Sequence, residues 1–229
     1  MTRILILVTN HTRFDNPKAE PTGLWLSELS HFFDVFDGTD VEIQIASPKG
    51  GDIAIDPRSL RFPVYDKATR ARHQDPRFMA LLKNTPSIHE VDWSRYDAVY
   101  FAGGHGAMWD FAEDRALHVK TTELYERGGV VSAVCHGVAA LQNVRLSTGE
   151  MLQAGKRGTG FAYFDEAVAG VRKLVPYNMQ DRLKQAGLRY SKAFLPLPKH
   201  VVVDGTLITG QNTNSPTGTA QAVRQALAA

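Results

Sequence analysis

The only cysteine of the chain lies in the stretch VVSAVCHG, residues 130–137, between an apolar run and a histidine-glycine pair. The apolar run predicts a buried strand that ends at Val134, and the residues after it predict the start of a helix. Small residues on both sides of Cys135 permit a very sharp turn between the two. This layout is typical of a nucleophile elbow, which lifts a reactive side chain above the carboxyl edge of a sheet. The N-terminus of the following helix also predicts a lowered pKa for the thiol.

A carboxylate on an earlier predicted helix is a second candidate for chemistry. Four-residue spacing places Glu28 on the same helical face as the apolar residues Leu24 and Phe32. The side chain is therefore expected to point toward the sheet rather than into solvent. Burial penalises the charged form, and a nearby thiolate penalises it further, so the pKa of Glu28 should rise. We expect a thiolate paired with a carboxylic acid.

The glycine-rich stretch AGGHG, residues 102–106, follows another apolar run. Gly103 and Gly104 would let backbone donors approach a substrate oxygen closely, as an oxyanion site requires, although a plain strand-to-helix turn also favours glycine. His105 is either a substrate contact or an ordinary solvent-exposed residue. The stretch lacks the G-x-G-x-x-G spacing and the chain has no P-loop sequence, so no nucleotide site is predicted.

Apolar runs and helical periodicities predict the architecture that must hold these residues. Several runs are apolar on both faces, which is typical of central strands in a parallel sheet. Strands that alternate with helices indicate an α/β doubly wound, mostly parallel sheet with helices on both faces. The predicted strands are 4–8, 41–46, 98–104, 130–134 and 200–210, and the predicted helices are about 21–38, 116–126, 178–185 and 217–229.

The length of 229 residues fits one large domain that spans residues 1–229. Residues 48–76 are rich in proline, aspartate and basic residues, and we interpret them as an irregular surface excursion with one short strand at DIAID, residues 52–56. The pair Asp204-Gly205 lies between two β-branched runs, which predicts a hairpin.

Charge and composition limit the expected partners. The 26 basic and 24 acidic side chains nearly cancel and form no long block of one sign, so neither nucleic acid nor a membrane is predicted as a partner. One cysteine cannot form an internal disulfide, and no signal peptide is recognised, so we expect a cytoplasmic protein. No cysteine or histidine pair has the spacing of metal ligands, and we expect no metal and no other cofactor.

Five motifs together resemble the ThiJ/PfpI superfamily, over nearly the whole chain and in the order of that family. They are PTGLWLSEL, ASPKGG, AGGHG, AVCHG and DGTLITGQN. The resemblance implies a class I glutamine-amidotransferase-like, flavodoxin-like fold. Within the superfamily, the chain is most similar to the branch of small chaperone-like proteins and glutathione-independent glyoxalases (glyoxalase III). The resemblance also implies a homodimer.

The same resemblance implies roles for individual residues. Cys135 matches the nucleophile of the family, His136 matches the histidine that follows it, and Glu28 matches the acidic residue that approaches the sulfur. Glu166 matches the carboxylate that orients the histidine, although a shift of one residue would exchange it with Asp165.

The resemblance further places a backbone N–H donor of an oxyanion hole at Gly104, with a second from His136. The side chain of His136 is not assigned a contact with the sulfur, because adjacent residues that leave a tight turn tend to point in different directions. It either tunes the electrostatics or passes protons through a carboxylate such as Glu166.

The reaction implied by the resemblance converts methylglyoxal, a small carbonyl substrate, to lactate. Cys135 would add to the aldehyde as a hemithioacetal, and Glu28 would move a proton between the two carbons. Two alternatives stay open. One is a cysteine-dependent amidase or protein deglycase, although the absence of an H-x-E sequence argues against a glutaminase. The other is a holdase chaperone or oxidative-stress sensor whose cysteine is oxidised.

Overall fold

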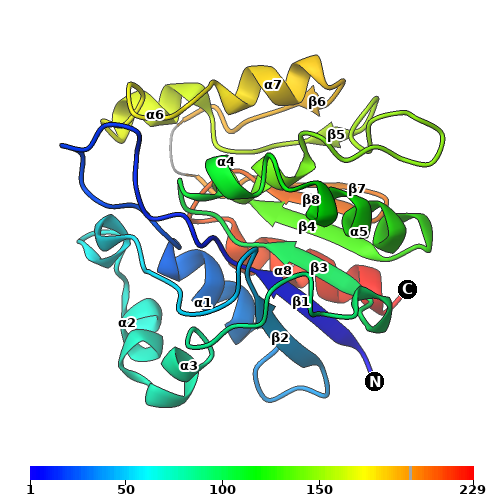
Figure 1. The fold of residues 1–229 in the computed structure, drawn as a ribbon, viewed down its shortest axis with the longest axis horizontal. Coiled ribbons are helices and arrows are strands. Elements are labelled where there is room, and N and C mark those ends of the chain that lie inside the picture. The colour runs from blue at the N-terminus through cyan, green and yellow to red at the C-terminus, as the bar shows by residue number, and fades with distance from the viewer. Residues whose placement is uncertain (196–197) are drawn as a thin grey trace.

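The computed structural model describes residues 1–195 and 198–229. Its centre is a six-stranded sheet in the order β2-β1-β3-β4-β8-β7 (Figure 1). Neighbouring strands are parallel except β7, which pairs antiparallel with β8 through the hairpin predicted at Asp204-Gly205. The strands are β1 (Arg3–Leu7), β2 (Glu42–Ala46), β3 (Ala98–Phe101), β4 (Val130–Val134), β7 (Val201–Asp204) and β8 (Leu207–Gly210).

Helices cover both faces of this sheet, because successive side chains of the central strands point to opposite faces and both sets are apolar. Ile4 and Ile6 of β1 pack with α1 (Leu26–Asp34) and α8 (Pro216–Leu227) on one face. Leu5 and Leu7 belong to the other core, with α4 (Ala107–Asp110), α5 (Arg115–Glu126) and the 3-10 helix η3 (Cys135–Leu141). The doubly wound α/β fold predicted from the sequence is confirmed.

The remaining elements lie outside this sheet, and among them β5 and β6 pair parallel in a second, two-stranded sheet (Figure 1). In that view α6, α7, β5 and β6 lie along the top, and α2 and α3 lie at the lower left beside α1. Their bounds are η1 (Pro57–Leu60), α2 (Lys67–Gln74), α3 (Pro76–Ala80), η2 (Trp93–Arg95), β5 (Arg157–Gly158), α6 (Tyr163–Val168), α7 (Met179–Gln185) and β6 (Arg189–Tyr190).

The excursion at 48–76 is more regular than the sequence indicated. It contains η1 and α2, each begun by an aspartate whose side chain accepts a backbone N–H. The strand expected at residues 52–56 is wrong: Ile55 alone forms an isolated bridge, with Leu24. The backbone beside Ile55 is hydrogen-bonded to Leu24, through Ala54 O and Asp56 N, and the 3-10 helix η1 begins directly afterwards at Pro57, which ends the pairing.

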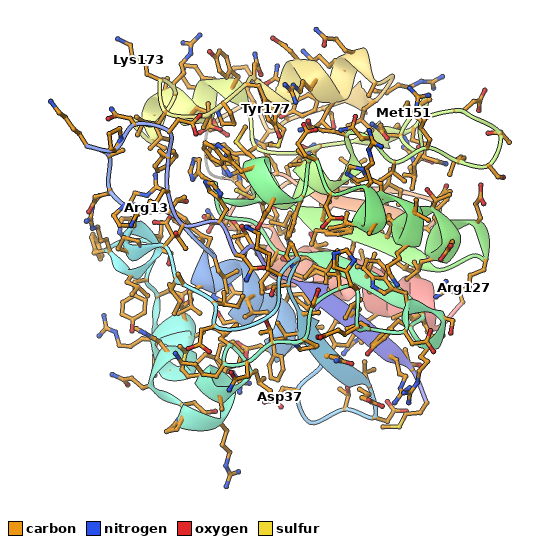
Figure 2. All side chains as sticks on the ribbon, viewed as in Figure 1. Arg13, Asp37, Arg127, Met151, Lys173 and Tyr177 are labelled. Carbon is orange, nitrogen blue, oxygen red and sulfur yellow. The ribbon has the colours of Figure 1, made fainter. Side chains whose placement is uncertain are left out.

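Many charged side chains lie on the outside of the layers. Arg13, Asp37 and Lys173 are exposed, and Figure 2 shows them extending outward from the ribbon. Among the described residues, no helix combines the length and the apolar composition needed to cross a membrane.

The sharp turn after β4 requires a glycine at position 137. A Cβ there would lie 2.2 Å from the carbonyl oxygen of Phe101 in β3, whose backbone is held in the sheet. We predict that Gly137→Ala lowers the free energy of unfolding by about 1–3 kcal/mol, the usual cost of overpacking, measured by urea denaturation. Gly218→Ala in α8 is the control, because its nearest neighbour at 3.1 Å is the flexible end of Lys199. Equal stability of the two variants would contradict the prediction.

Candidate active site

The backbone turns sharply where β4 meets η3. Cys135 has a φ of 56°, in the left-handed region that residues other than glycine seldom adopt. The residue is only 3% exposed, yet it lines a cavity. The structure therefore has the elbow geometry predicted from the sequence, although the segment that follows is a 3-10 helix rather than an α-helix.

His136 bridges the sulfur and a buried carboxylate. Its Nδ1 lies 3.2 Å from Cys135 Sγ, and its Nε2 lies 2.7 Å from Glu166 Oε1. The two neighbouring side chains, Cys135 and His136, both face the cavity, a contact that the sequence left unassigned. A thiol, an imidazole and a carboxylate in this order form the usual arrangement of an activated cysteine nucleophile.

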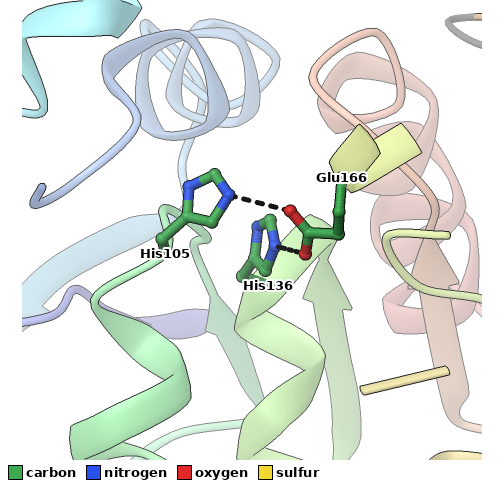
Figure 3. A group of neighbouring side chains, drawn as sticks. All are labelled: His105, His136 and Glu166. Atoms are coloured by element: carbon green, nitrogen blue, oxygen red, sulfur yellow. Dashed lines mark hydrogen bonds and ion pairs between the residues drawn. The ribbon is translucent and has the colours of Figure 1, made fainter. Parts of the chain in front are cut away.

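Glu166, and not its neighbour Asp165, contacts His136. Asp165 Oδ2 instead accepts a hydrogen bond of 3.0 Å from Gln211 Nε2. The second oxygen of Glu166 lies 3.1 Å from His105 Nε2, so one carboxylate joins two histidines (Figure 3). Burial alone would raise the pKa of Glu166, but the adjacent His136 and the hydrogen bond from His105 hold this pKa well below its usual range. Glu166 is therefore an ionised carboxylate.

Arg58 sets the direction of the hydrogen bonds in this cluster. Its Nη2 lies 3.2 Å from His105 Nδ1, and a guanidinium group can only donate. His105 Nδ1 must therefore accept, and His105 Nε2–H donates to Glu166. Burial, aided by the nearby His136, lowers the pKa of His105 to about 4, which favours the neutral ring that this pattern requires. Where His136 likewise donates from Nε2 to Glu166, its Nδ1 is the ring nitrogen that faces the thiol.

Arg58 is itself fixed by a fully buried carboxylate. Its Nε donates 2.9 Å to Asp56 Oδ1, and its Nη2 pairs with Asp56 Oδ2. Asp56 also accepts from Thr22 Oγ1 at 3.0 Å. Sequence reasoning missed Arg58 and Asp56, because both lie in the excursion and no motif relates them to the cysteine.

Glu28 reaches the sulfur from α1. It is fully buried, its Oε2 accepts the Gly103 N–H at 2.9 Å, and its Oε1 has no hydrogen-bond partner among the described residues. A Cβ on Gly103 would lie 2.3 Å from Glu28 Oε2 and 3.0 Å from Cys135 Cβ, so the two side chains meet over this glycine. Burial raises the pKa of Glu28 to about 8, against the opposing hydrogen bonds of Cys135 and Gly103. The raised pKa predicted for Glu28 is confirmed.

The position of α1 is set by contacts with β3. The ring of Phe32 stacks on Tyr100 with centroids 3.7 Å apart, and the Tyr100 hydroxyl donates 2.8 Å to the carbonyl oxygen of Glu28. These contacts place the carboxyl group of Glu28 at the end of β3 rather than further along the sheet.

The lowered thiol pKa predicted from the sequence is wrong. Burial raises the pKa of Cys135 well above its usual value, the adjacent Glu28 raises it further, and only the His136 backbone N–H acts in the opposite direction. The effect of desolvation on the thiol pKa is larger than the effect of the short helix that follows. Because two buried acids in contact do not both ionise, a thiolate forms only while Glu28 keeps its proton. Because Oε2 accepts the Gly103 N–H, Oε1 is the oxygen of Glu28 that is available to carry the proton.

The AGGHG stretch has three separate tasks. Gly103 donates its N–H to Glu28, so this group is not free for a substrate oxygen. Gly104 has a φ of 117°, and its N–H donates no hydrogen bond within residues 1–195 and 198–229. His105 is buried and lines the cavity, which answers the question that the sequence left open between a site residue and an exposed one. Neither Gly103 nor Gly104 is among the described residues that line the cavity.

The cavity above Cys135 has a volume of about 360 Å³. Part of the lining comes from Arg58 and residues 61–64 of the excursion, and another part comes from the end of α6 and Asp165. Its lining consists of Trp25, Arg58, Arg61, Phe62, Pro63, Val64, His105, Cys135, His136, Phe161, Asp165, Val168, Ala169, Asn212 and Thr213.

The cluster in Figure 3 also offers the donor atoms of a metal site. One ligand atom each from His105, His136 and Glu166 lie within 4.8 Å of one another. Two histidines and a carboxylate are a common ligand set for zinc. Sequence spacing gave no hint of this grouping, because the three residues come from separate segments. The hydrogen bonds to Arg58, Cys135 and Glu166 already engage every ring nitrogen of the two histidines.

A pH dependence of stability follows from Glu28. Its folded pKa of about 8 lies above the ordinary value of 4.5, so ionisation of the unfolded chain destabilises the folded state as pH rises between these values. We predict that the free energy of unfolding of the wild type, relative to Glu28→Gln, falls from pH 4.5 to pH 8. Urea titrations of both proteins at several pH values measure the difference. A difference that stays constant over this range would show that Glu28 ionises normally.

The orientation of the histidines can be tested through Arg58→Lys. The lysine keeps a positive charge beside Asp56 but does not carry the fork that reaches His105. We predict that His105 loses its fixed Nε2–H form, which 15N NMR of labelled histidine detects as averaged nitrogen shifts. Arg61→Lys, at an exposed ion pair with Glu20, is the control and should leave the spectrum unchanged. Identical His105 shifts in wild type and Arg58→Lys would contradict the prediction.

Curated relatives resemble the chain over nearly its whole length. It is 31% identical to "Glyoxalase 3" of Candida albicans, with 97% of each chain covered. It is 28% identical to the glutathione-independent glyoxalase HSP31 of Saccharomyces cerevisiae, with 95% of this chain and 94% of that protein covered.

Solved structures agree with this similarity. The Rapid Encystment Protein 24 KDa of Francisella tularensis matches with a TM-score of 0.93 and 38% identity, over 99% of both chains. Glyoxalase III from Candida albicans matches with a TM-score of 0.90 and 30% identity, over 98% of this chain and 97% of that one. The DJ-1/PfpI family pattern matches residues 22–225, which include Glu28, Cys135, His136 and Glu166. The chain therefore belongs to the DJ-1/PfpI family.

Proposed function

We propose that the protein is a glutathione-independent glyoxalase that converts methylglyoxal to lactate, with Cys135 as the nucleophile. The observation that carries this proposal is the position of the thiol, between Glu28 on one side and the His136–Glu166 pair on the other, at the wall of a cavity. The names of the curated relatives support it, because several are called glutathione-independent glyoxalases.

In the first step the thiol proton passes to His136 Nδ1, 3.2 Å from the sulfur. Ionised Glu166 stabilises the imidazolium that forms. The thiolate adds to the aldehyde carbon of methylglyoxal, and the aldehyde oxygen takes the proton from Glu28. The product is a hemithioacetal, and Glu28 is left as a carboxylate.

Glu28 then acts as the base. Its carboxylate takes the hydrogen from the former aldehyde carbon and returns a proton to the neighbouring carbon, while the hydroxyl proton of the hemithioacetal passes to the former ketone oxygen. This leaves a lactoyl thioester on Cys135. Water hydrolyses this thioester, and lactate and the free thiol are released. The scheme uses a carboxyl group with a pKa near neutrality, and burial raises the pKa of Glu28 to about 8.

The developing negative charge on the substrate oxygen needs a donor. The Gly104 N–H is the proposed group, because it is not engaged by any described residue, whereas Gly103 is committed to Glu28. Gly104 itself is not a lining residue, but the next residue, His105, lines the cavity. The backbone N–H of His136 is the proposed second donor, since it already acts on the charge of the sulfur.

Lactate formation from methylglyoxal tests the proposal. Cys135→Ala should abolish it, and Glu28→Gln should reduce kcat by about 100-fold or more, the usual effect of removing a positioned acid or base. Glu123→Gln, an exposed carboxyl on α5, is the matched control and should retain full activity. Turnover by Cys135→Ala at the rate of the wild type would refute cysteine catalysis.

Amide hydrolysis is a second candidate, favoured by the contact of 3.2 Å between His136 Nδ1 and the sulfur. The same thiol, imidazole and carboxylate would attack an amide, and His136 would protonate the leaving amine. Glu28 has no necessary part in that reaction. Turnover of a simple amide that survives Glu28→Gln but not Cys135→Ala, without lactate formation, would favour the hydrolase.

A further inference from the structure

The cavity is much larger than the proposed substrate. A water molecule occupies about 30 Å³ of the liquid, so a volume of about 360 Å³ would hold roughly a dozen waters. Methylglyoxal is a three-carbon molecule, and with its aldehyde at the sulfur it would leave most of this space to solvent. The size of the cavity therefore suits a carbonyl compound with a larger substituent.

The surface beyond the catalytic residues is apolar. We define the apolar subsite as Phe62, Pro63 and Val64 of the excursion together with Val168 and Ala169 at the end of α6. Phe62 is 94% exposed and Val168 is 58% exposed, although both line the cavity. Exposed apolar side chains that line one cavity gain free energy when an apolar group displaces the water in contact with them.

The two arginines of the cavity are already paired with carboxylates, Arg58 with Asp56 and Arg61 with Glu20. An anionic substituent would therefore lose its hydration without gaining a free cation, which disfavours its binding. The carboxylate of Asp165 accepts a hydrogen bond from the uncharged amide of Gln211 and adds a further repulsion of anions. An uncharged apolar substituent meets no such cost.

We propose that the apolar subsite receives the aryl or branched alkyl group of an α-oxoaldehyde whose aldehyde carbon lies at Cys135. This inference rests on the proposed function for the identity of the reacting group, and on the cavity for the identity of the substituent. Phenylglyoxal is the probe of this class. It takes up one water and becomes mandelate by the same proton transfer that makes lactate from methylglyoxal.

The first measurement compares initial rates for phenylglyoxal and methylglyoxal. We expect kcat/KM to be at least about 10-fold higher for phenylglyoxal, since small differences in buried apolar groups are worth this much in enzyme pockets. Val168→Asp should lower this ratio, because it places an unpaired charge on the subsite. Phe164→Ala removes a side chain that is 60% exposed and lies outside the cavity lining, so it should leave the ratio unchanged.

A second measurement does not depend on glyoxalase activity. Iodoacetamide and N-phenyliodoacetamide both alkylate Cys135, the only cysteine, by forming an S–C bond with loss of iodide. Intact mass gives the two rates. We expect the phenyl reagent to be favoured at Cys135, relative to free cysteine, by about 10-fold or more, and Val168→Asp should remove this preference.

The two measurements separate the two proposals. A phenyl preference in alkylation without mandelate or lactate formation would support the subsite and refute the glyoxalase. Lactate formation with no preference for phenylglyoxal, and alkylation rates in the same ratio as for free cysteine, would overturn the subsite and leave the proposed function standing.

Discussion

A carboxyl group and a thiol that meet in a buried position impose the central constraint on this molecule. Glu28 and Cys135 face each other over Gly103, and both side chains are almost completely buried. Desolvation and proximity therefore disfavour the simultaneous ionisation of the two groups. Each group has a partner that favours loss of its proton. The Gly103 N–H stabilises a charge on Glu28, and the His136–Glu166 pair accepts a proton from the sulfur.

The parallel sheet supplies this arrangement. Gly103 to His105 follow β3, and Cys135 follows the neighbouring strand β4, so both segments emerge at the same carboxyl edge. Open α/β sheets bind ligands in the crevice outside that edge. Glu28 reaches the sulfur from α1, which covers the same face of the sheet as α8. The contacts of Tyr100 hold α1 against β3. Three segments that are distant in the sequence thus converge on one sulfur atom.

The sequence predicted most of the sheet, because its strands are continuous apolar runs bounded by turn residues. It missed α2, which is a polar helix on the surface without an apolar stripe, and the short strands of the second sheet, where two residues give no periodicity. The pattern around Glu28 predicted its burial, since Leu24 and Phe32 share its face. Arg58 could not be predicted in the same way, because its role depends on a fold that brings the excursion against His105. The sign of the thiol pKa shift was wrong for a related reason, since the sequence indicates a helix N-terminus but not the amount of water excluded around Cys135.

One short segment of the excursion carries both Arg58, which orients the histidines, and Phe62, which stands at the rim of the cavity. Arg58 lies in η1 and Phe62 lies two residues after it, so a change in the backbone of this segment would move both side chains. Natural variation that reshapes the rim would also shift the guanidinium, and selection for new substrates would act at the same time on proton transfer. Among relatives, the range of substrates and the proton transfer at the histidines are therefore expected to change together rather than separately.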